Sequence, residues 1–255
     1  SLRQFLESRD DFFRVEGDFS FSVAMYVPTT CSFDLFSATR DRHARNTRLF
    51  CRGVFVTDDC SEVCPSWLSF LQVAVSADDL DLHVGRSGMQ HRMLLSVIEK
   101  QVVQHAVAML EALSQTEKWD DFWSRYSREL RLGAHDDERH RERLARLCAW
   151  KTVLRPNESA VTLKDFVESL EADVPVYYVT GQGSADQISN LPCVEGLVAH
   201  GVNALIFNEP IDAYVALRLT QVSGRQVVNV GAVGTRFPWS QGEPDTSDKL
   251  CTALQ

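Results

Sequence analysis

Two spacings of apolar residues divide the first half of the chain. Residues 18–27 alternate between apolar and small or polar side chains, with Phe21 and Val23 on the same side. This period of two predicts a strand with one buried face, and a second strand is predicted at 49–58. Over residues 94–113 apolar side chains return every three or four positions, which predicts one long amphipathic helix.

Two charged helical stretches follow this helix. Residues 117–133 place their aromatic side chains on one face, and Gly133 is predicted to be the C-terminal cap. Residues 136–150 are predicted as a second helix. The polar, proline-containing segment 155–159 has no period, and it is therefore predicted to be a domain boundary.

The last third of the chain alternates helices with short strands rich in β-branched residues. This rhythm is typical of a parallel α/β sheet. The predicted helices cover 163–170, 184–201 and 211–219, and the predicted strands cover 175–181, 204–210 and 225–230.

Charge and cysteine usage narrow the class of protein. With 26 basic and 35 acidic residues the net charge is -9, which argues against a nucleic-acid partner. The chain has no unbroken run of 18 apolar residues, so we expect no membrane span. Its seven cysteines are scattered and odd in number, which favours reduced thiols and a cytoplasmic location. The chain does not begin with Met, and we interpret it as a piece of a longer protein.

One glycine pair resembles part of a nucleotide-binding motif. Gly181 and Gly183 follow a predicted strand and precede a predicted helix, an order in which backbone N–H groups can hold a phosphate. The third glycine of the dinucleotide fingerprint is missing, and so is a suitable acidic residue. A plain turn is favoured, with a free-standing dinucleotide enzyme as an alternative.

Two groups of metal-binding residue types are incomplete. His135 and His140 are five residues apart and would diverge on a helix, whereas a helical zinc pair is spaced by four. A solvated helix start accounts for the acids between them. Cys60 and Cys64 lack a second ligand pair at suitable spacing. We therefore predict no metal site.

Arg86 lies in a predicted, glycine-containing loop. At this loop the spacing of apolar residues changes from a period of two, typical of strands, to a period of 3.6, typical of helices. A loop arginine is ordinarily solvated or salt-bridged. The alternative is that its guanidinium stabilises the γ-phosphoryl oxygens of a nucleotide that is bound elsewhere. The chain has neither a nucleophile elbow nor a Walker lysine motif, so we find no complete active site within it.

Eight segments in collinear order between residues 13 and 237 carry a family resemblance. They are FRVEGDFSFSVAMYVP, FDLF, RGVFVTDDCSEVCPSWLSF, DDLDLHVGR, RLGAHDDERHRERL, VTLKDFVESL, VYYVTG and NEPIDAYV. Together they closely resemble the middle segment of the ninety-kilodalton heat-shock protein (heat shock protein 90) chaperone family. The resemblance implies an α/β fold with a large α/β/α sandwich at 1–115, a short helical coil at 116–154, a smaller α/β/α sandwich at 155–237 and a linker at 238–255.

The resemblance also implies a function. ATP and Mg are expected in a separate N-terminal domain, and Arg86 is expected to reach the γ-phosphate with help from Gln90. Phe55 is expected to support the loop. The expected partners are client proteins, co-chaperones and the protein's own N-terminal and C-terminal domains. The full-length protein would be a homodimeric ATPase, whereas this chain alone would be monomeric and inactive. Family members also occur in the endoplasmic reticulum and other organelles, which are the alternatives to the cytoplasm.

The loop departs from the family's usual pattern. The departures are Asp81, His83, Gly85, Ser87 and Gly88. Added glycine freedom raises the entropic cost of holding Arg86 in place. These departures motivate a second hypothesis, in which the chain belongs to a divergent, non-catalytic scaffold that binds proteins without arginine-assisted ATP hydrolysis.

Overall fold

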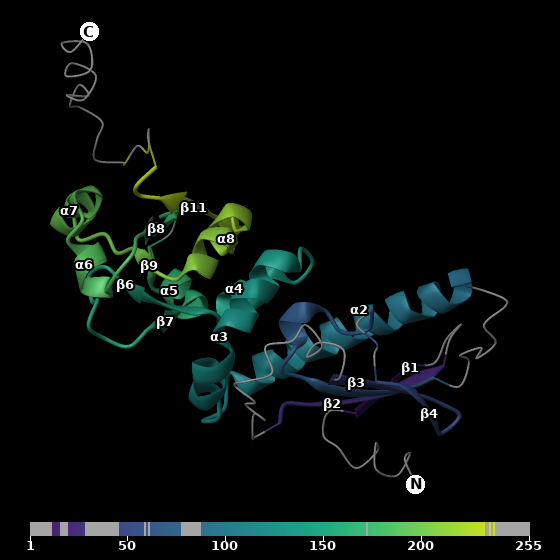
Figure 1. Ribbon diagram of the computed structural model, residues 1–255. Helices are drawn as coiled ribbons and strands as arrows, with labels where there is room; N and C mark the ends of the chain where they lie inside the picture. The colour runs from purple at the N-terminus through teal and green to yellow at the C-terminus, as the bar shows by residue number, and fades with distance from the viewer. Residues whose placement is uncertain are drawn as a thin grey trace. The chain divides into compact units, whose positions relative to one another are not determined.

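The chain folds into two compact units, which Figure 1 shows in a computed structural model. The first unit contains residues 1–148 with 162–164, and the second contains 149–161 with 165–255. The structure describes residues 12–15, 20–28, 46–58, 60, 62–77, 88–171, 173–232, 235 and 237. Each unit is a mixed α/β structure, as predicted. The separate helical coil and the predicted linker stay predictions.

The first unit is built on a five-stranded sheet with the order β1-β2-β5-β3-β4. Strands β3 and β5 run parallel, and every other neighbouring pair is antiparallel. The strands are β1 (Phe12–Val15), β2 (Phe21–Tyr26), β3 (Thr47–Cys51), β4 (Val54–Thr57) and β5 (Gln72–Ala77).

Strand β2 confirms the period-two prediction. Phe21, Val23 and Met25 are at most 2% exposed, whereas Tyr26 is exposed. Val23 pairs with Val75 of β5, a strand absent from the predicted elements. The buried face of the sheet is therefore built from alternate residues of two neighbouring strands.

The single strand predicted at 49–58 is wrong, because the chain reverses within it. Arg52 and Gly53 both have positive φ, 49° and 78°. Two successive residues of this conformation form the tight turn that suits the twist of a hairpin. Strands β3 and β4 therefore pair with each other, and β4 becomes the edge of the sheet.

The helix predicted at 94–113 is confirmed as α2 (Gly88–Leu113), which begins six residues earlier. Figure 1 shows α2 lying along the sheet. Its stripe of Ile98, Val102 and Ala106 is fully buried. By length and composition alone, residues 92–113 could cross a membrane. The helix packs this buried stripe against strand β2. Its apolar composition is therefore that of a helix in the core of the unit.

The prediction that Gly133 caps a helix is wrong. It lies inside α3 (Trp119–Asp136), and the cap is Asp137, whose N–H donates to the Gly133 carbonyl at 2.9 Å. A Cβ on Gly133 would lie 2.7 Å from the ring of Trp67, a residue of the 3-10 helix η3 (Ser66–Leu68). This glycine is required by close packing of the two elements.

The helix predicted at 136–150 is also too long. Helix α4 (Arg141–Leu147) ends before β6 (Ala149–Thr152), so Trp150 belongs to a strand. Trp150 is only 2% exposed and packs against Phe207, with ring centroids 4.9 Å apart and an interplanar angle of 34°. The apolar residues at 148–150 continue the helical pattern of α4. Packing in the second unit nevertheless makes Ala149 and Trp150 part of a strand.

The second unit is built on a six-stranded sheet with the order β10-β11-β8-β9-β6-β7. The predicted strands are confirmed as β8, β9 and β11, and they run parallel to one another. Strand β10, at one edge, pairs antiparallel with β11, and β6 pairs antiparallel with β9. The strands are β6, β7 (Val161–Thr162), β8 (Val176–Thr180), β9 (Leu205–Phe207), β10 (Gln221–Val222) and β11 (Arg225–Asn229).

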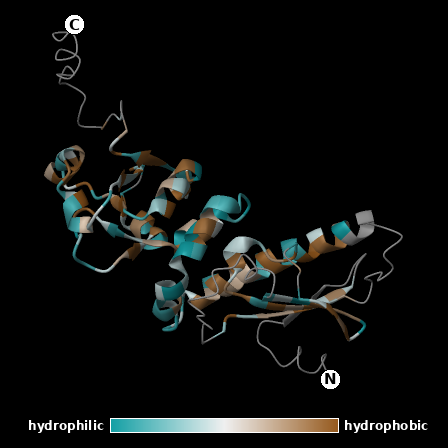
Figure 2. Cartoon of the chain, in the orientation of Figure 1, coloured by the Kyte–Doolittle hydropathy of each residue, from teal (hydrophilic) through white to brown (hydrophobic). Residues whose placement is uncertain are grey.

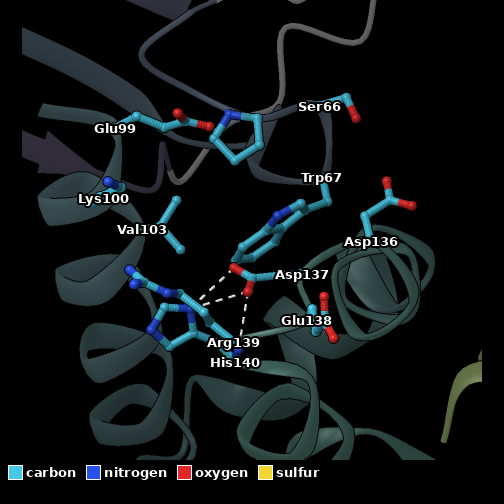
Figure 3. Close-up of a pocket in the computed structure, with 11 residues that line it drawn as sticks. Ser66, Trp67, Glu99, Lys100, Val103, Asp136, Asp137, Glu138, Arg139 and His140 are labelled. Atoms are coloured by element: carbon cyan, nitrogen blue, oxygen red, sulfur yellow. Dashed lines mark hydrogen bonds and ion pairs between the residues drawn. The ribbon is translucent and has the colours of Figure 1, made fainter. Parts of the chain in front are cut away.

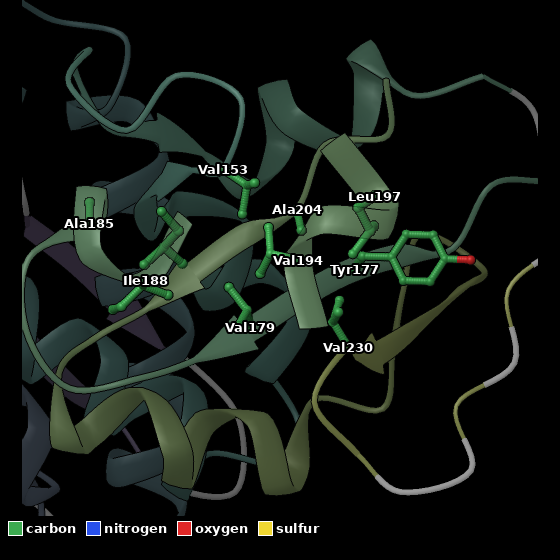
Figure 4. Close-up of a cluster of buried hydrophobic side chains, with 10 residues drawn as sticks. Val153, Tyr177, Val179, Ala185, Ile188, Val194, Leu197, Ala204 and Val230 are labelled. Carbon is green, nitrogen blue, oxygen red and sulfur yellow. The ribbon is translucent and has the colours of Figure 1, made fainter. Parts of the chain in front are cut away.

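Four short helices lie in this part of the chain: α5 (Leu163–Ser169), whose first two residues belong to the first unit, α6 (Ala185–Ser189), α7 (Pro192–Ala199) and α8 (Pro210–Arg218). The single helix predicted at 184–201 is wrong, because Pro192 starts a new helix there. Figure 4 shows Ile188 of α6 and Val194 of α7 meeting Val179 of β8 in the hydrophobic core. Figure 2 shows the hydropathy of each residue on this fold, and the three residues of β9 are all hydrophobic.

A buried carboxylate joins α8 to β6. Asp212 is fully buried; its Oδ1 accepts a hydrogen bond from Trp150 Nε1 at 2.8 Å, and its Oδ2 accepts one from the Glu209 N–H at 2.9 Å. The carboxylate therefore caps the helix and satisfies the indole at the same time.

We expect Asp212→Ala to lower the free energy of unfolding of the second unit by about 2 kcal/mol. Loss of the cap costs about 1 kcal/mol, and an unsatisfied buried indole N–H costs about as much again. Urea unfolding with hydrogen exchange on residues 149–230 measures the change. Asp186→Ala, at an exposed position on α6, is the matched control. Equal effects of the two variants would contradict the assigned role of Asp212.

Candidate functional site

The predicted catalytic residues lie where β5 gives way to α2. Strand β5 ends at Ala77 and α2 begins at Gly88. Arg86 falls outside the described residues. Gln90 lies in the first turn of α2, and its side chain is also outside the described part. Their joint action on a phosphate stays a prediction.

Phe55, the predicted support for the loop, lies on the edge strand β4 and is 52% exposed. Its ring meets the edge of Phe50 on β3, with centroids 5.8 Å apart and an interplanar angle of 71°. The two residues pair across the hairpin, so the turn at Arg52 and Gly53 fixes where the ring lies. The support of the loop by Phe55 stays a prediction, and half of the Phe55 surface is open to a further contact.

A second site, which sequence reasoning missed, is a cavity of about 360 Å³ in the first unit. We call it the acidic pocket. Figure 3 shows carboxylates from α2 and from the segment after α3 around the ring of Trp67. Its lining residues are Pro65, Ser66, Trp67, Glu99, Lys100, Val103, Asp136, Asp137, Glu138, Arg139 and His140.

A histidine and an aspartate are paired inside the acidic pocket. Asp137 Oδ1 accepts the His140 backbone N–H at 2.9 Å, and its Oδ2 lies 3.1 Å from His140 Nδ1. Burial raises the pKa of Glu99; Lys100 opposes this shift, and Asp137 adds to it. The sequence HDDERH leads into α4. Asp136, Glu138 and Arg139 are exposed, in agreement with the predicted solvated helix start, whereas Asp137 and His140 are half-buried and paired.

The candidate metal ligands do not converge. His135 Nδ1 lies 2.7 Å from its neighbour Asp136, and His140 pairs with Asp137 instead. Within the described residues no group of three or more His, Cys, Asp or Glu side chains is placed to hold a metal ion.

Cys60 and Cys64 are both buried, and neither forms a disulfide. Burial raises the pKa of the Cys64 thiol to about 12. The protonated thiol donates to the Leu68 carbonyl at 3.8 Å. Such a thiol acts as a small apolar side chain, since the reactive form is the thiolate.

Gly181 and Gly183 fit the interpretation as a plain turn. A Cβ on Gly181 would lie 2.8 Å from Ile188, and Gly183 has φ 115°. Ser184 and Gln187 then form a capping box at the start of α6. Packing and backbone conformation thus explain both glycines without a bound phosphate.

The two sheets and their helices define a mixed α/β protein of two units, and the comparisons with known proteins place it in a family. The model of the Hsp90 protein family matches residues 7–254, so the chain belongs to the Hsp90 family. The solved middle domain of a heat shock protein from Plasmodium falciparum superposes with a TM-score of 0.73 at 26% identity. The superposition covers 87% of this chain and 86% of that one.

Two relatives show how much of a whole protein this chain spans. It is 30% identical over 231 residues to heat shock protein 83 of Leishmania donovani, which covers 90% of this chain and 50% of that protein. It is 34% identical over 223 residues to an endoplasmin homologue of Caenorhabditis elegans, covering 87% and 29%. The chain spans half or less of these relatives.

Proposed function

We propose that this chain is the middle segment of an ATP-dependent molecular chaperone. In this proposal Arg86 reaches the γ-phosphate of ATP that, with Mg, is held by a separate N-terminal domain, and Gln90 assists from the first turn of α2. The observation that carries the proposal is the family match over residues 7–254, together with the likeness to a solved middle domain. The full-length protein is an ATPase in this account, and this chain alone is inactive.

The partners follow from the same assignment. Client proteins and co-chaperones bind the surfaces of the segment, and the protein's own N-terminal and C-terminal domains flank it. The chain alone is monomeric, and the full-length protein is a homodimer. The relatives include a heat shock protein 83 and an endoplasmin homologue, which supports either the cytoplasm or the endoplasmic reticulum as its compartment.

A divergent scaffold without arginine-assisted hydrolysis is the second candidate. Gly88, the first residue of α2, favours it, because glycine weakens the helix turn that carries Gln90. The two candidates differ in whether ATP turnover depends on Arg86.

The separation of the ATP pocket from this chain is directly testable. We expect calorimetry of the isolated chain with Mg·ATP to give no saturable heat and the chain to show no ATP hydrolysis. The full-length protein should bind ATP under the same conditions. Circular dichroism of the isolated chain confirms that the inactive sample is folded.

Saturable nucleotide binding by the folded, isolated chain would contradict this assignment. If Gly183→Val abolished that binding, the alternative of a free-standing dinucleotide enzyme would replace the assignment to a chaperone segment. Val changes this position strongly, because Gly183 has a positive φ that residues with a side chain rarely adopt.

A further inference from the structure

A cavity of about 310 Å³ in the first unit is lined by more basic than acidic side chains, whereas the whole chain is acidic. We call it the basic cavity. It is lined by residues at the end of α2, on α4 and at the start of α5, including Arg143, Arg146 and Lys164 beside one carboxylate, Glu111. The lining therefore has an excess of two positive charges in a chain of net charge -9.

The single carboxylate in the basic cavity is already engaged. Arg143 Nε donates to Glu111 Oε1 at 2.8 Å, and Arg143 Nη2 donates to Oε2 at 2.6 Å. This bidentate pair lowers the pKa of Glu111, mainly through the hydrogen bond from Arg143. The pair links α2 to α4 and holds the Arg143 guanidinium at the cavity wall.

The other two cations come from separate segments. Arg146 lies in the last turn of α4, and Lys164 lies 18 residues further along the chain, in the first turn of α5. The Lys164 ammonium makes no ion pair with another described residue. The fold brings Arg146 and Lys164 to one cavity, although they do not belong to a single basic run in the sequence.

Two polar residues of the cavity lining, Ser114 and Gln115, directly follow the end of α2. Ser114 Oγ donates to the Glu111 carbonyl at 2.7 Å, and Gln115 Nε2 donates to Ser114 Oγ at 3.1 Å. The first of these bonds satisfies one carbonyl at the end of α2. The charge of the lining comes from Arg143, Arg146, Lys164 and Glu111.

We propose that the basic cavity binds a phosphate group, either free phosphate or a phosphate monoester, through Arg146 and Lys164, with Arg143 held beside them by Glu111. A guanidinium fork and an ammonium that approach from different segments suit a dianion with several oxygens better than a carboxylate. The cavity is also larger than one phosphate, which leaves room for the organic part of an ester.

The experiment titrates the folded chain with inorganic phosphate and with O-phosphoserine at constant ionic strength, followed by calorimetry or amide chemical shifts. We expect saturable binding of at least one of the two. Arg146→Ala and Lys164→Ala should each weaken it at least about tenfold. Lys100→Ala, which removes the same charge from an exposed position on α2, should leave it unchanged.

The comparison of ligands identifies the source of the phosphate. Tighter binding of O-phosphoserine than of phosphate assigns the cavity to a monoester, and the reverse order assigns it to free phosphate. Absence of saturable binding by both ligands would overturn the proposal. So would equal binding of acetate, or an equal loss of affinity in Lys100→Ala, because each indicates unspecific charge attraction.

Discussion

Gly133→Val is expected to lower the free energy of unfolding of the first unit by about 3 kcal/mol, the upper end of the usual cost of overpacking a core site. A Cβ at this position would lie 2.7 Å from Trp67 Cε3 and 3.2 Å from Leu144 Cδ1. Trp67 is 1% exposed and Leu144 is fully buried, so neither side chain can move into solvent. The added methyl groups must therefore displace α3 from η3.

The measurement is urea unfolding of the chain, with hydrogen exchange over 94–147 to assign the loss to the first unit. Gly196→Val is the matched control, because Gly196 lies on the exposed side of α7 with nothing within 4 Å of its added Cβ. In a Trp67→Ala background, Gly133→Val should cost much less, because the clashing ring is gone. Equal costs in the two backgrounds would contradict the packing explanation.

Elements that bury one regular face were predictable from the sequence. Strand β2 and helix α2 each present a stripe that repeats at the period of its own secondary structure. The parallel strands β8, β9 and β11 were predictable for a related reason, because short β-branched runs alternated with helices.

Errors arose where a local conformation or a distant contact decided the structure. The hairpin between β3 and β4 depends on positive φ at Arg52, which no apolar pattern reveals. Trp150 continues the helical pattern of α4, but its partner Asp212 lies 62 residues away. The place of Gly133 depends on Trp67, a residue of another element.

Some parts of the candidate sites could likewise be predicted from the sequence, and others could not. Arg86 could be singled out from its glycine-containing loop alone. Gln90 and Phe55 were predictable only from the family resemblance, because neither forms a recognisable motif by itself. The acidic pocket and the basic cavity were missed, because each is assembled from distant segments. Glu111 and Arg143, for example, are 32 residues apart.

Arg86→Ala in the full-length protein is expected to reduce ATP turnover by about a thousandfold. An arginine that contacts the transferring γ-phosphoryl group contributes about this factor or more in GTPases, because it stabilises charge that develops in the transition state. The loss should fall on kcat, whereas the affinity for ATP should change little, since the ATP pocket is proposed to lie on another domain. Arg86→Lys should recover only part of the rate, because lysine lacks the planar fork.

Gln90→Ala provides a second, smaller effect in the same direction, because Gln90 is proposed to assist Arg86. Arg48→Ala is the control for charge removal, since Arg48 is exposed on β3. Thermal unfolding of each variant separates lost catalysis from lost folding.

The most direct test of the account is steady-state ATP turnover at saturating ATP by the full-length protein, the Arg86→Ala variant and the Arg48→Ala variant, with ATP affinity measured in parallel. The account predicts a loss of about a thousandfold for Arg86→Ala alone, at unchanged ATP affinity. Unchanged turnover by a folded Arg86→Ala protein would contradict the catalytic role of Arg86 and leave the scaffold hypothesis in its place.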